Sequence, residues 1–196
     1  MAKKAKTASG KSGAKRAKGN GRAKPADAIA LLKGDHRTVE ALFEKFETTK
    51  GSKAKLRIAH EICMELIIHA QIEEEVFYPA VKEVVEEDLY TEAHVEHDGA
   101  KVLIAEILEG DPEDEFYDAS VKVLSEMIKH HVHEEEMRDG MFAQARQGDV
   151  DLDALGEQLE QRKADLKRLY ERNGLPRPKT RTMKAMPKVE LGQPVA

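Results

Sequence analysis

Apolar residues recur every three or four positions in five separate stretches of the 196-residue chain. This spacing is typical of amphipathic helices, each of which buries one face. The predicted helices cover about residues 27–48, 53–85, 91–109, 112–146 and 149–174.

Short breaks separate these stretches. Gly51-Ser52 follows the first, and Gly110-Asp111-Pro112 combines a helix stop, a cap and a first helical residue. Pro79 is expected to kink or interrupt the second helix. Long helices joined by short loops pack as antiparallel neighbours. The pattern therefore predicts an all-α fold, an up-down-up-down four-helix bundle with an additional short C-terminal helix.

The two ends of the chain lack this pattern. Residues 1–25 consist mainly of Ala, Lys, Gly and Ser, and we expect them to form a disordered basic tail. Residues 175–196 contain four prolines and are predicted to be a second disordered tail. The bundle would then occupy residues 26–148, and the C-terminal helix residues 149–174.

Ionisable residues interrupt the apolar stripes at positions where a core side chain is expected. The pattern His-x-x-x-Glu occurs at His69/Glu73 and again within His130-His131-Val132-His133-Glu134-Glu135-Glu136. Residues i and i+4 of a helix point the same way, so each motif presents an imidazole and a carboxylate to one place. The predicted inward residues on the four bundle helices are His36, His69, Glu73, His97, His131 and Glu135.

The second motif has two possible phases. His130/Glu134 has the same i, i+4 spacing as His131/Glu135. The phase set by Val121, Leu124 and Ile128 favours His131/Glu135, and the other pair stays open as an alternative.

Buried glutamates need a compensating cation. An unpaired ion in a protein interior costs several kcal/mol or more, and the stripes contain no inward Lys or Arg. Two divalent metal ions would resolve this, because carboxylates bridge cations while imidazoles fill terminal positions. Imidazole and carboxylate without thiolate suit iron, manganese or zinc, and incomplete coordination favours Fe(II).

Two other metalloprotein classes fit less well. Ferritin-like di-iron bundles use Glu-x-x-His on two helices, and no histidine here has Glu three residues before it. A His-Glu-x-x-His zinc hydrolase motif is also missing.

Charge and composition add a possible partner and a compartment. Residues 1–26 contain nine Lys/Arg and no acid, although the whole chain has a net charge of −5. Such an arm could bind nucleic acid by releasing counterions from phosphates. No apolar run reaches the ~18–20 residues of a membrane span, and no signal peptide is evident. With a single cysteine, Cys63, the sequence suggests a cytoplasmic protein without membrane attachment.

Four stretches together resemble the hemerythrin family, specifically bacterial hemerythrin-like domains named for their His-His-Glu cation-binding pattern. They span about residues 27 to 147 and read LLKGDHRTVEALFEKF, HAQIEEEVFYPAV, TEAHVEHDGAKVLI and KHHVHEEEMRDGMFAQAR. The family implies a four-helix bundle that holds a non-haem di-iron centre. It also favours His131/Glu135, through the pattern His-Val-x-Glu-Glu-Glu.

The resemblance assigns a role to each inward residue. His36 and His69 would be terminal ligands of one iron, His97 and His131 would serve the other, and Glu73 and Glu135 would bridge. Oxygen-carrying members supply two histidines four residues apart from the third helix. Here that position holds Lys101, so one iron could keep an open position or recruit His94 or a solvent ligand.

The sequence therefore predicts a small di-iron protein that binds or reacts with O₂, peroxide or NO, for sensing or for oxidative or nitrosative protection. Whether it is an enzyme is left open. The alternatives are an iron storage or donation protein, and a DNA-associated protective iron protein that uses residues 1–25.

Overall fold

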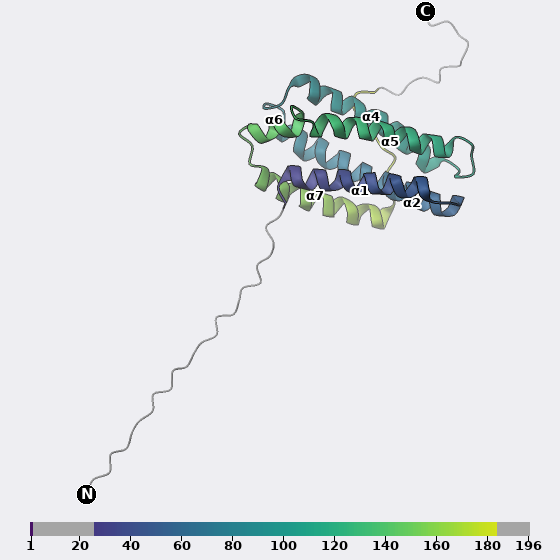
Figure 1. Ribbon diagram of the computed structural model, residues 1–196, viewed down its shortest axis with the longest axis horizontal. Coiled ribbons are helices and arrows are strands. Elements are labelled where there is room, and N and C mark those ends of the chain that lie inside the picture. Colours follow the sequence, from purple (N-terminus) through teal and green to yellow (C-terminus); the bar gives the residue numbers. More distant parts are fainter. Residues whose placement is uncertain (2–25, 184–196) are drawn as a thin grey trace, which may run out of the picture.

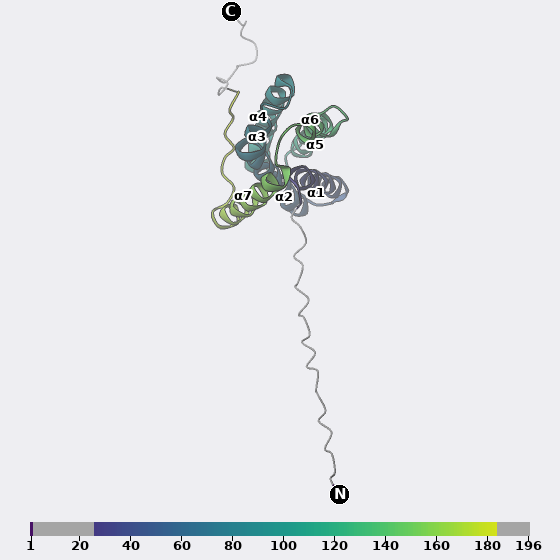
Figure 2. The same cartoon turned by 90° about the vertical axis from the view of Figure 1, so that its left-hand side faces the viewer.

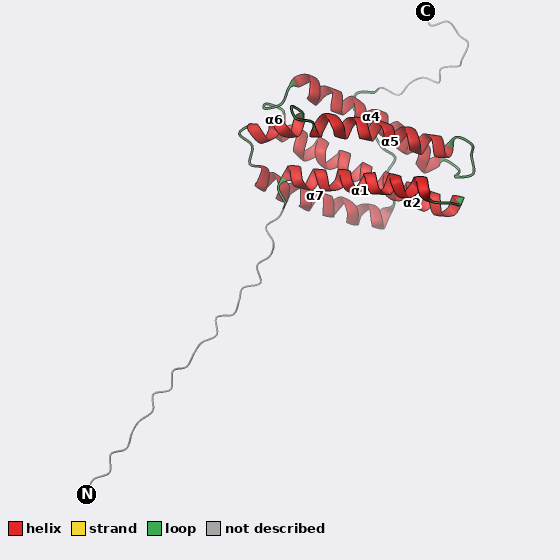
Figure 3. Cartoon of the chain, viewed as in Figure 1, coloured by secondary structure: helices red, strands yellow, loops and turns green. Residues whose placement is uncertain are grey.

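The computed structural model describes Met1 and residues 26–183, and these contain helices, turns and loops but no strand (Figure 3). The predicted basic tail, apart from Met1, and the final thirteen residues lie outside the described part of the chain. The helical elements are α1 (Ala28–Thr48), α2 (Ser52–Ile72), the π-helix η1 (Glu73–Phe77), α3 (Tyr78–Val81), α4 (Glu87–Glu109), α5 (Tyr117–Glu136), α6 (Met141–Gln147) and α7 (Leu152–Asn173).

Capping residues explain several helix ends. The Asp27 carboxylate accepts a hydrogen bond from the Ala30 N–H at the start of α1, and Asp151 does the same for Ala154 at the start of α7. Such caps satisfy backbone donors that a helix leaves free. Gly174 ends α7 with φ at 79°, a left-handed conformation that suits glycine.

The four long helices α1, α2, α4 and α5 form the predicted bundle (Figure 1). Consecutive long helices are neighbours, and α1 also contacts α5, which closes the bundle. The fifth long helix, α7, packs outside the bundle against α1 and α2 (Figure 2). Aliphatic side chains such as Leu32, Ile62, Ile104, Leu124 and Leu159 fill the interior. The all-α bundle with an additional C-terminal helix is thus confirmed.

Two predicted helices differ in detail from those observed. The stretch 53–85 is divided into α2, the π turn η1 and α3. The stretch 112–146 begins only at Tyr117, because the carboxylates of Asp111 and Asp114 accept backbone hydrogen bonds two residues later and hold 111–116 in turns. It is also divided into α5 and α6 by the break at residues 137–140. At the other end of α5, Gly140 approaches the backbone oxygens of Glu134 and Glu135 so closely that a Cβ would lie 2.1 Å from the first.

After α7 the chain returns to the bundle and contacts α4. The carboxylate of Asp98, which is fully buried, accepts hydrogen bonds from the backbone N–H groups of Arg181, Thr182 and Met183 and from the Thr182 hydroxyl. The first nine residues of the predicted C-terminal tail, 175–183, therefore have a defined place. None of the described helices is both long and apolar enough to cross a membrane.

Candidate metal centre

Four helices direct the predicted site residues to one region of the interior. α1 supplies His36, α2 supplies His69, α4 supplies His97, and α5 supplies His131 together with Glu135. The sixth residue, Glu73, begins the π turn η1. Each of the six is at most 6% exposed, so the structure brings all the predicted side chains together in the core.

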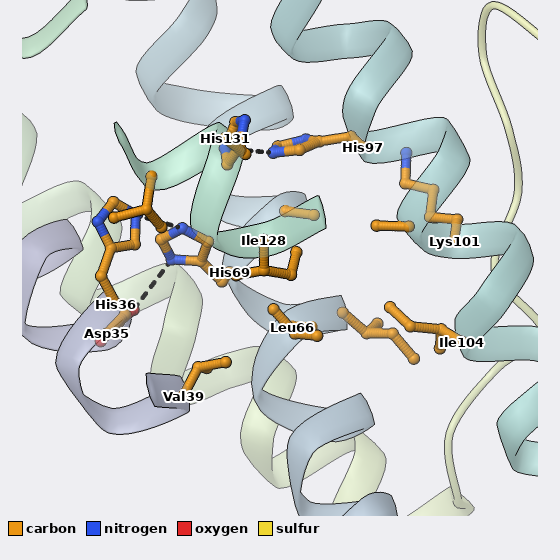
Figure 4. Close-up of a pocket in the computed structure, with 14 residues that line it drawn as sticks. Asp35, His36, Val39, Leu66, His69, His97, Lys101, Ile104, Ile128 and His131 are labelled. Atoms are coloured by element: carbon orange, nitrogen blue, oxygen red, sulfur yellow. Dashed lines mark hydrogen bonds and ion pairs between the residues drawn. The ribbon is translucent and has the colours of Figure 1, made fainter. Parts of the chain in front are cut away.

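The four imidazoles meet in two pairs through their Nε2 atoms. His36 Nε2 lies 3.1 Å from His69 Nε2, and His97 Nε2 lies 3.2 Å from His131 Nε2 (Figure 4). These are the two pairs that the family resemblance assigns to separate ions.

Each glutamate lies between the two pairs. Glu73 Oε2 is 3.2 Å from the Nε2 of His69 and 3.4 Å from that of His97. Glu135 Oε2 is 3.3 Å from the Nε2 of His36 and 3.7 Å from that of His131. Both carboxylates thus contact one histidine of each pair, which is the placement that bridging ligands require.

The buried glutamates have no adequate partner among the described protein groups. Both oxygens of Glu73 and Oε2 of Glu135 are inaccessible to solvent and accept no hydrogen bond. Burial, together with the negative charge of Glu135, raises the pKa of Glu73 well above its usual value. Burial lowers the pKa of His69 to about 4, so this imidazole is neutral at pH 7 and can donate a lone pair. A buried site in which the His69 imidazole is neutral and three carboxylate oxygens lack partners fits cations.

The outer nitrogen of every inward histidine faces a carboxylate. The Nδ1 distances are 2.7 Å for His36–Glu136, 3.5 Å for His69–Asp35, 2.9 Å for His97–Glu74 and 2.8 Å for His131–Glu96. A carboxylate at Nδ1 favours the tautomer with its proton there and leaves Nε2 free for a metal ion. Asp35, Glu74, Glu96 and Glu136, which sequence analysis missed, are called the outer carboxylates below.

Tyr78 is a further side chain that sequence analysis did not place in the site. Its hydroxyl donates to Glu135 Oε1 at 3.1 Å and lies 3.2 Å from His97 Nε2. The π turn brings Tyr78 inward, because the wider turn lets the Tyr78 N–H bond to the carbonyl oxygen of Glu73, five residues earlier. Burial and the charges of Glu135 and Glu73 raise the Tyr78 pKa well above 10, so the phenol stays protonated.

Oxygen-carrying members of the family have a second ligand histidine on the third bundle helix, and neither Lys101 nor His94 of α4 takes its place. The Lys101 ammonium lies 2.6 Å from Glu74 Oε1 and 3.3 Å from Asp98 Oδ1, where its charge is paired. His94 is buried outside the two clusters of ligand atoms, with Nε2 3.2 Å from the Arg181 guanidinium. Its recruitment as a ligand, which the sequence left open, is not seen.

The alternative pair His130/Glu134 lies at the surface. The His130 side chain is 61% exposed, and it sits 3.2 Å from Glu134 and 3.4 Å from Glu96. The other two histidines, His60 and His133, are exposed. Of the two phases, only His131/Glu135 reaches the core.

A small cavity adjoins the imidazoles. It has a volume of about 30 Å³, and the side chains that line it away from the histidines are mostly aliphatic (Figure 4). These include Val39, Leu66, Ile104 and Ile128. An apolar space of this size suits a small neutral molecule better than an ion.

Comparison with known proteins identifies the bundle. The family model described as Hemerythrin HHE cation binding domain matches residues 27–145. A hemerythrin HHE cation-binding domain-containing protein from Mycobacterium kansasii has the same fold, with a TM-score of 0.63 at 22% identity over 76% of this chain and 95% of that one.

A curated relative from Nostoc sp., named DNA nickase, is 27% identical over 106 residues. The match covers 54% of this chain and 30% of the relative, so this chain spans less than a third of that protein's length.

Proposed function

Because the chain belongs to the hemerythrin HHE cation-binding family, we propose that its buried centre holds two non-haem iron ions and binds or reacts with O₂, peroxide or NO. His36 and His69 would hold one iron, and His97 and His131 the other. Glu73 and Glu135 would bridge the two ions. The observation that carries this proposal is the pair of buried glutamates among the four inward Nε2 atoms, in which both oxygens of Glu73 and Oε2 of Glu135 lack hydrogen-bond partners.

Features around the centre support a small oxidant or diatomic ligand. When bound, a ferrous pair supplies electrons and an open coordination position. The aliphatic cavity beside the histidines admits a small molecule and excludes bulk water. The protonated Tyr78 hydroxyl lies 3.1 Å from Glu135 Oε1. From there it can donate a hydrogen bond to a small molecule bound at the iron pair.

Lys101 stands where oxygen-carrying family members have a ligand histidine. This difference favours a redox reaction of the bound ligand over reversible O₂ binding. With lysine at this position, the second ion would be held by two histidines and two shared carboxylates, which would leave at least one position open. An open position beside a proton donor suits reduction of peroxide or O₂.

The test is metal content and optical spectrum of the ferrous-loaded protein, prepared without oxygen and then exposed to air. We expect about two irons per chain and new near-ultraviolet and visible bands on oxygenation. His69→Ala should lose the pair, whereas His60→Ala, which removes an exposed histidine from the same helix, should keep it. Equal iron content in both variants would contradict the proposal. Iron that exchanges rapidly with a chelator and does not react with O₂ would favour iron storage or donation.

A DNA-associated role is the second candidate. It is supported by the nine basic residues within 1–26 and by the relative named DNA nickase. Removing residues 2–25 should then abolish salt-sensitive retention of the protein on duplex DNA, while the iron content stays the same. Unchanged retention would rule out this use of the arm.

A further inference from the structure

A second group of metal-ligand side chains lies on the surface formed by α4 and α5. Glu96, His130 and Glu134 each offer one ligand atom, and these atoms lie within 4.8 Å of one another. The His130 Nε2 atom is central, 3.4 Å from Glu96 Oε1 and 3.2 Å from Glu134 Oε1. This group is called the surface triad below.

The two carboxylates of the surface triad differ from the other carboxylates around the centre in their ion-pair partners. The other three outer carboxylates pair with fixed cations: Glu136 with Lys33 and Arg37, Glu74 with Lys101, and Asp35 with Lys163. Within residues 26–183, the ion pairs of Glu96 and Glu134 involve histidines alone. Two carboxylates without a fixed cation, beside an exposed imidazole, favour a divalent metal ion.

The surface triad is connected directly to the buried centre. Glu96 faces His130 with Oε1 and holds the Nδ1 atom of His131 with Oε2, at 2.8 Å. A cavity of about 10 Å³ is lined by residues of both groups, Glu96 and Glu134 of the surface triad and His131 and Glu135 of the buried centre, together with Leu89, Ala93 and Met141. Its volume matches about one water molecule.

We propose that Glu96, His130 and Glu134 form a surface site for a divalent cation, through which metal ions enter the buried centre. Imidazole and carboxylate oxygens suit Fe²⁺ and its neighbours in the first transition series. With three protein ligands, the ion keeps several waters and is held less tightly than an ion at the buried centre. The route rests on the proposed buried metal pair, because it describes how that pair is filled.

The experiment compares two double variants of the full chain with Co²⁺ as the probe. His130→Ala with Glu134→Gln removes two members of the surface triad. Glu96 is kept, because it also holds His131. The control, His133→Ala with Glu126→Gln, removes an exposed histidine and an exposed carboxylate from the same helix and changes the charge equally. Equilibrium dialysis measures bound Co²⁺, and stopped-flow absorbance measures how fast the buried centre fills.

We expect three Co²⁺ ions per chain in the control, two tight and one weak, and only the two tight ions in the triad variant. Filling of the buried centre should be about tenfold slower in the triad variant, because the local attraction for the cation is lost. Equal filling rates in the two variants would overturn the route, whether or not a third ion binds.

A separate variant distinguishes this inference from the proposed function. His69→Ala should lose the tight pair and keep the weak ion at the surface triad. If the unaltered chain binds no tight pair, the proposed function fails and the route falls with it. If the tight pair binds and fills equally fast in both double variants, the proposed function stands and only the route is wrong.

Discussion

The Glu73 side chain is fully buried, and neither of its carboxylate oxygens has a hydrogen-bond partner among the described residues. In the cation-free protein this carboxylate is destabilising, whether it is charged near Glu135 or forced to take up a proton. We therefore expect Glu73→Gln to raise the free energy of unfolding of the cation-free chain by about 1 kcal/mol or more. The same substitution should abolish the stabilisation that a metal ion gives.

Urea unfolding with and without anaerobic Fe²⁺ measures both effects. Fe²⁺ should stabilise the unaltered chain. Without Fe²⁺, the Glu73→Gln chain should be more stable than the unaltered chain, and with Fe²⁺ it should not be. A Glu73→Gln chain that is less stable without metal would show that the carboxylate contributes to folding on its own.

The outer carboxylates lead to a second prediction at the residue scale. Glu74 accepts a hydrogen bond from His97 Nδ1, and losing such a partner typically weakens metal binding by about 10–100-fold. Glu74→Gln should therefore lower cation affinity by that range in competition with a chelator. The adjacent Glu75→Gln should not, because Glu75 is exposed and pairs with Arg162. Equal losses in both variants would mean that total charge, not the hydrogen bond, determines affinity.

The six inward residues could be predicted from sequence, because i, i+4 spacing and the apolar stripes fix which way a helical side chain points. The outer carboxylates were missed, although each directly adjoins an inward residue in sequence. Glu74 follows Glu73, yet it holds His97 of a different helix. A side chain next to an inward residue is rotated by about 100° and leans toward the neighbouring helix, so its partner depends on the packing.

At the scale of elements, the π turn at Glu73–Phe77 shows where a fixed period fails. In a regular helix of 3.6 residues per turn, Phe77 would lie near the buried stripe of α2, but Tyr78 would point away from it. The wider turn keeps Glu73, Phe77 and Tyr78 all buried. Pro79 predicts an interruption of this helix, and the structure has one directly before it. The sequence does not show that the interruption is a π turn, so Tyr78 was assigned to packing rather than to the site.

The end of α5 gives a prediction for an element that carries site residues. A Cβ at Gly140 would lie 2.1 Å from the Glu134 carbonyl oxygen and 2.9 Å from that of Glu135. Backbone atoms cannot move aside cheaply, so Gly140→Ala should lower the free energy of unfolding by about 1–3 kcal/mol. It should also weaken cation binding, because the displaced turn carries Glu135.

Gly34→Ala is the matched comparison. Gly34 lies inside α1 beside two site residues, and a Cβ there would meet nothing within 4 Å. Alanine in an open helical position is favoured by about 0.5–1 kcal/mol over glycine, so this variant should be more stable. Thermal unfolding of both variants measures the opposite signs, and two changes in the same direction would contradict the structural explanation.

At the scale of the whole molecule, the C-terminal part of the chain stabilises the helices that carry the site. α7 covers α1 and α2, and the Lys163 ammonium on α7 pairs with Asp35, the outer carboxylate of His69. Arg181–Met183 hold Asp98, the residue after His97. These contacts join residues 83–128 positions apart. The pattern along the chain predicts the helices but contains no signal for such distant pairings.

The bundle as a whole should respond to metal in proportion to the number of ions that it binds. A cation that binds only the folded chain raises the free energy of unfolding by about 1.4 kcal/mol for each tenfold increase in its free concentration above the dissociation constant. Two ions filled together should give about twice this slope, about 2.8 kcal/mol. The measurement is urea unfolding at a series of buffered Co²⁺ concentrations.

The chain carrying His130→Ala with Glu134→Gln is the right background for this measurement, because the surface triad then adds no ion of its own. His69→Ala in that background should reduce the slope sharply, since it removes a ligand that lies 3.1 Å from His36 and 3.2 Å from Glu73. A slope near 1.4 kcal/mol per tenfold before that substitution would mean that the four histidines and two glutamates enclose a single ion. The slope thus decides between one ion and two from the stability of the folded bundle, independently of any reaction with O₂, peroxide or NO.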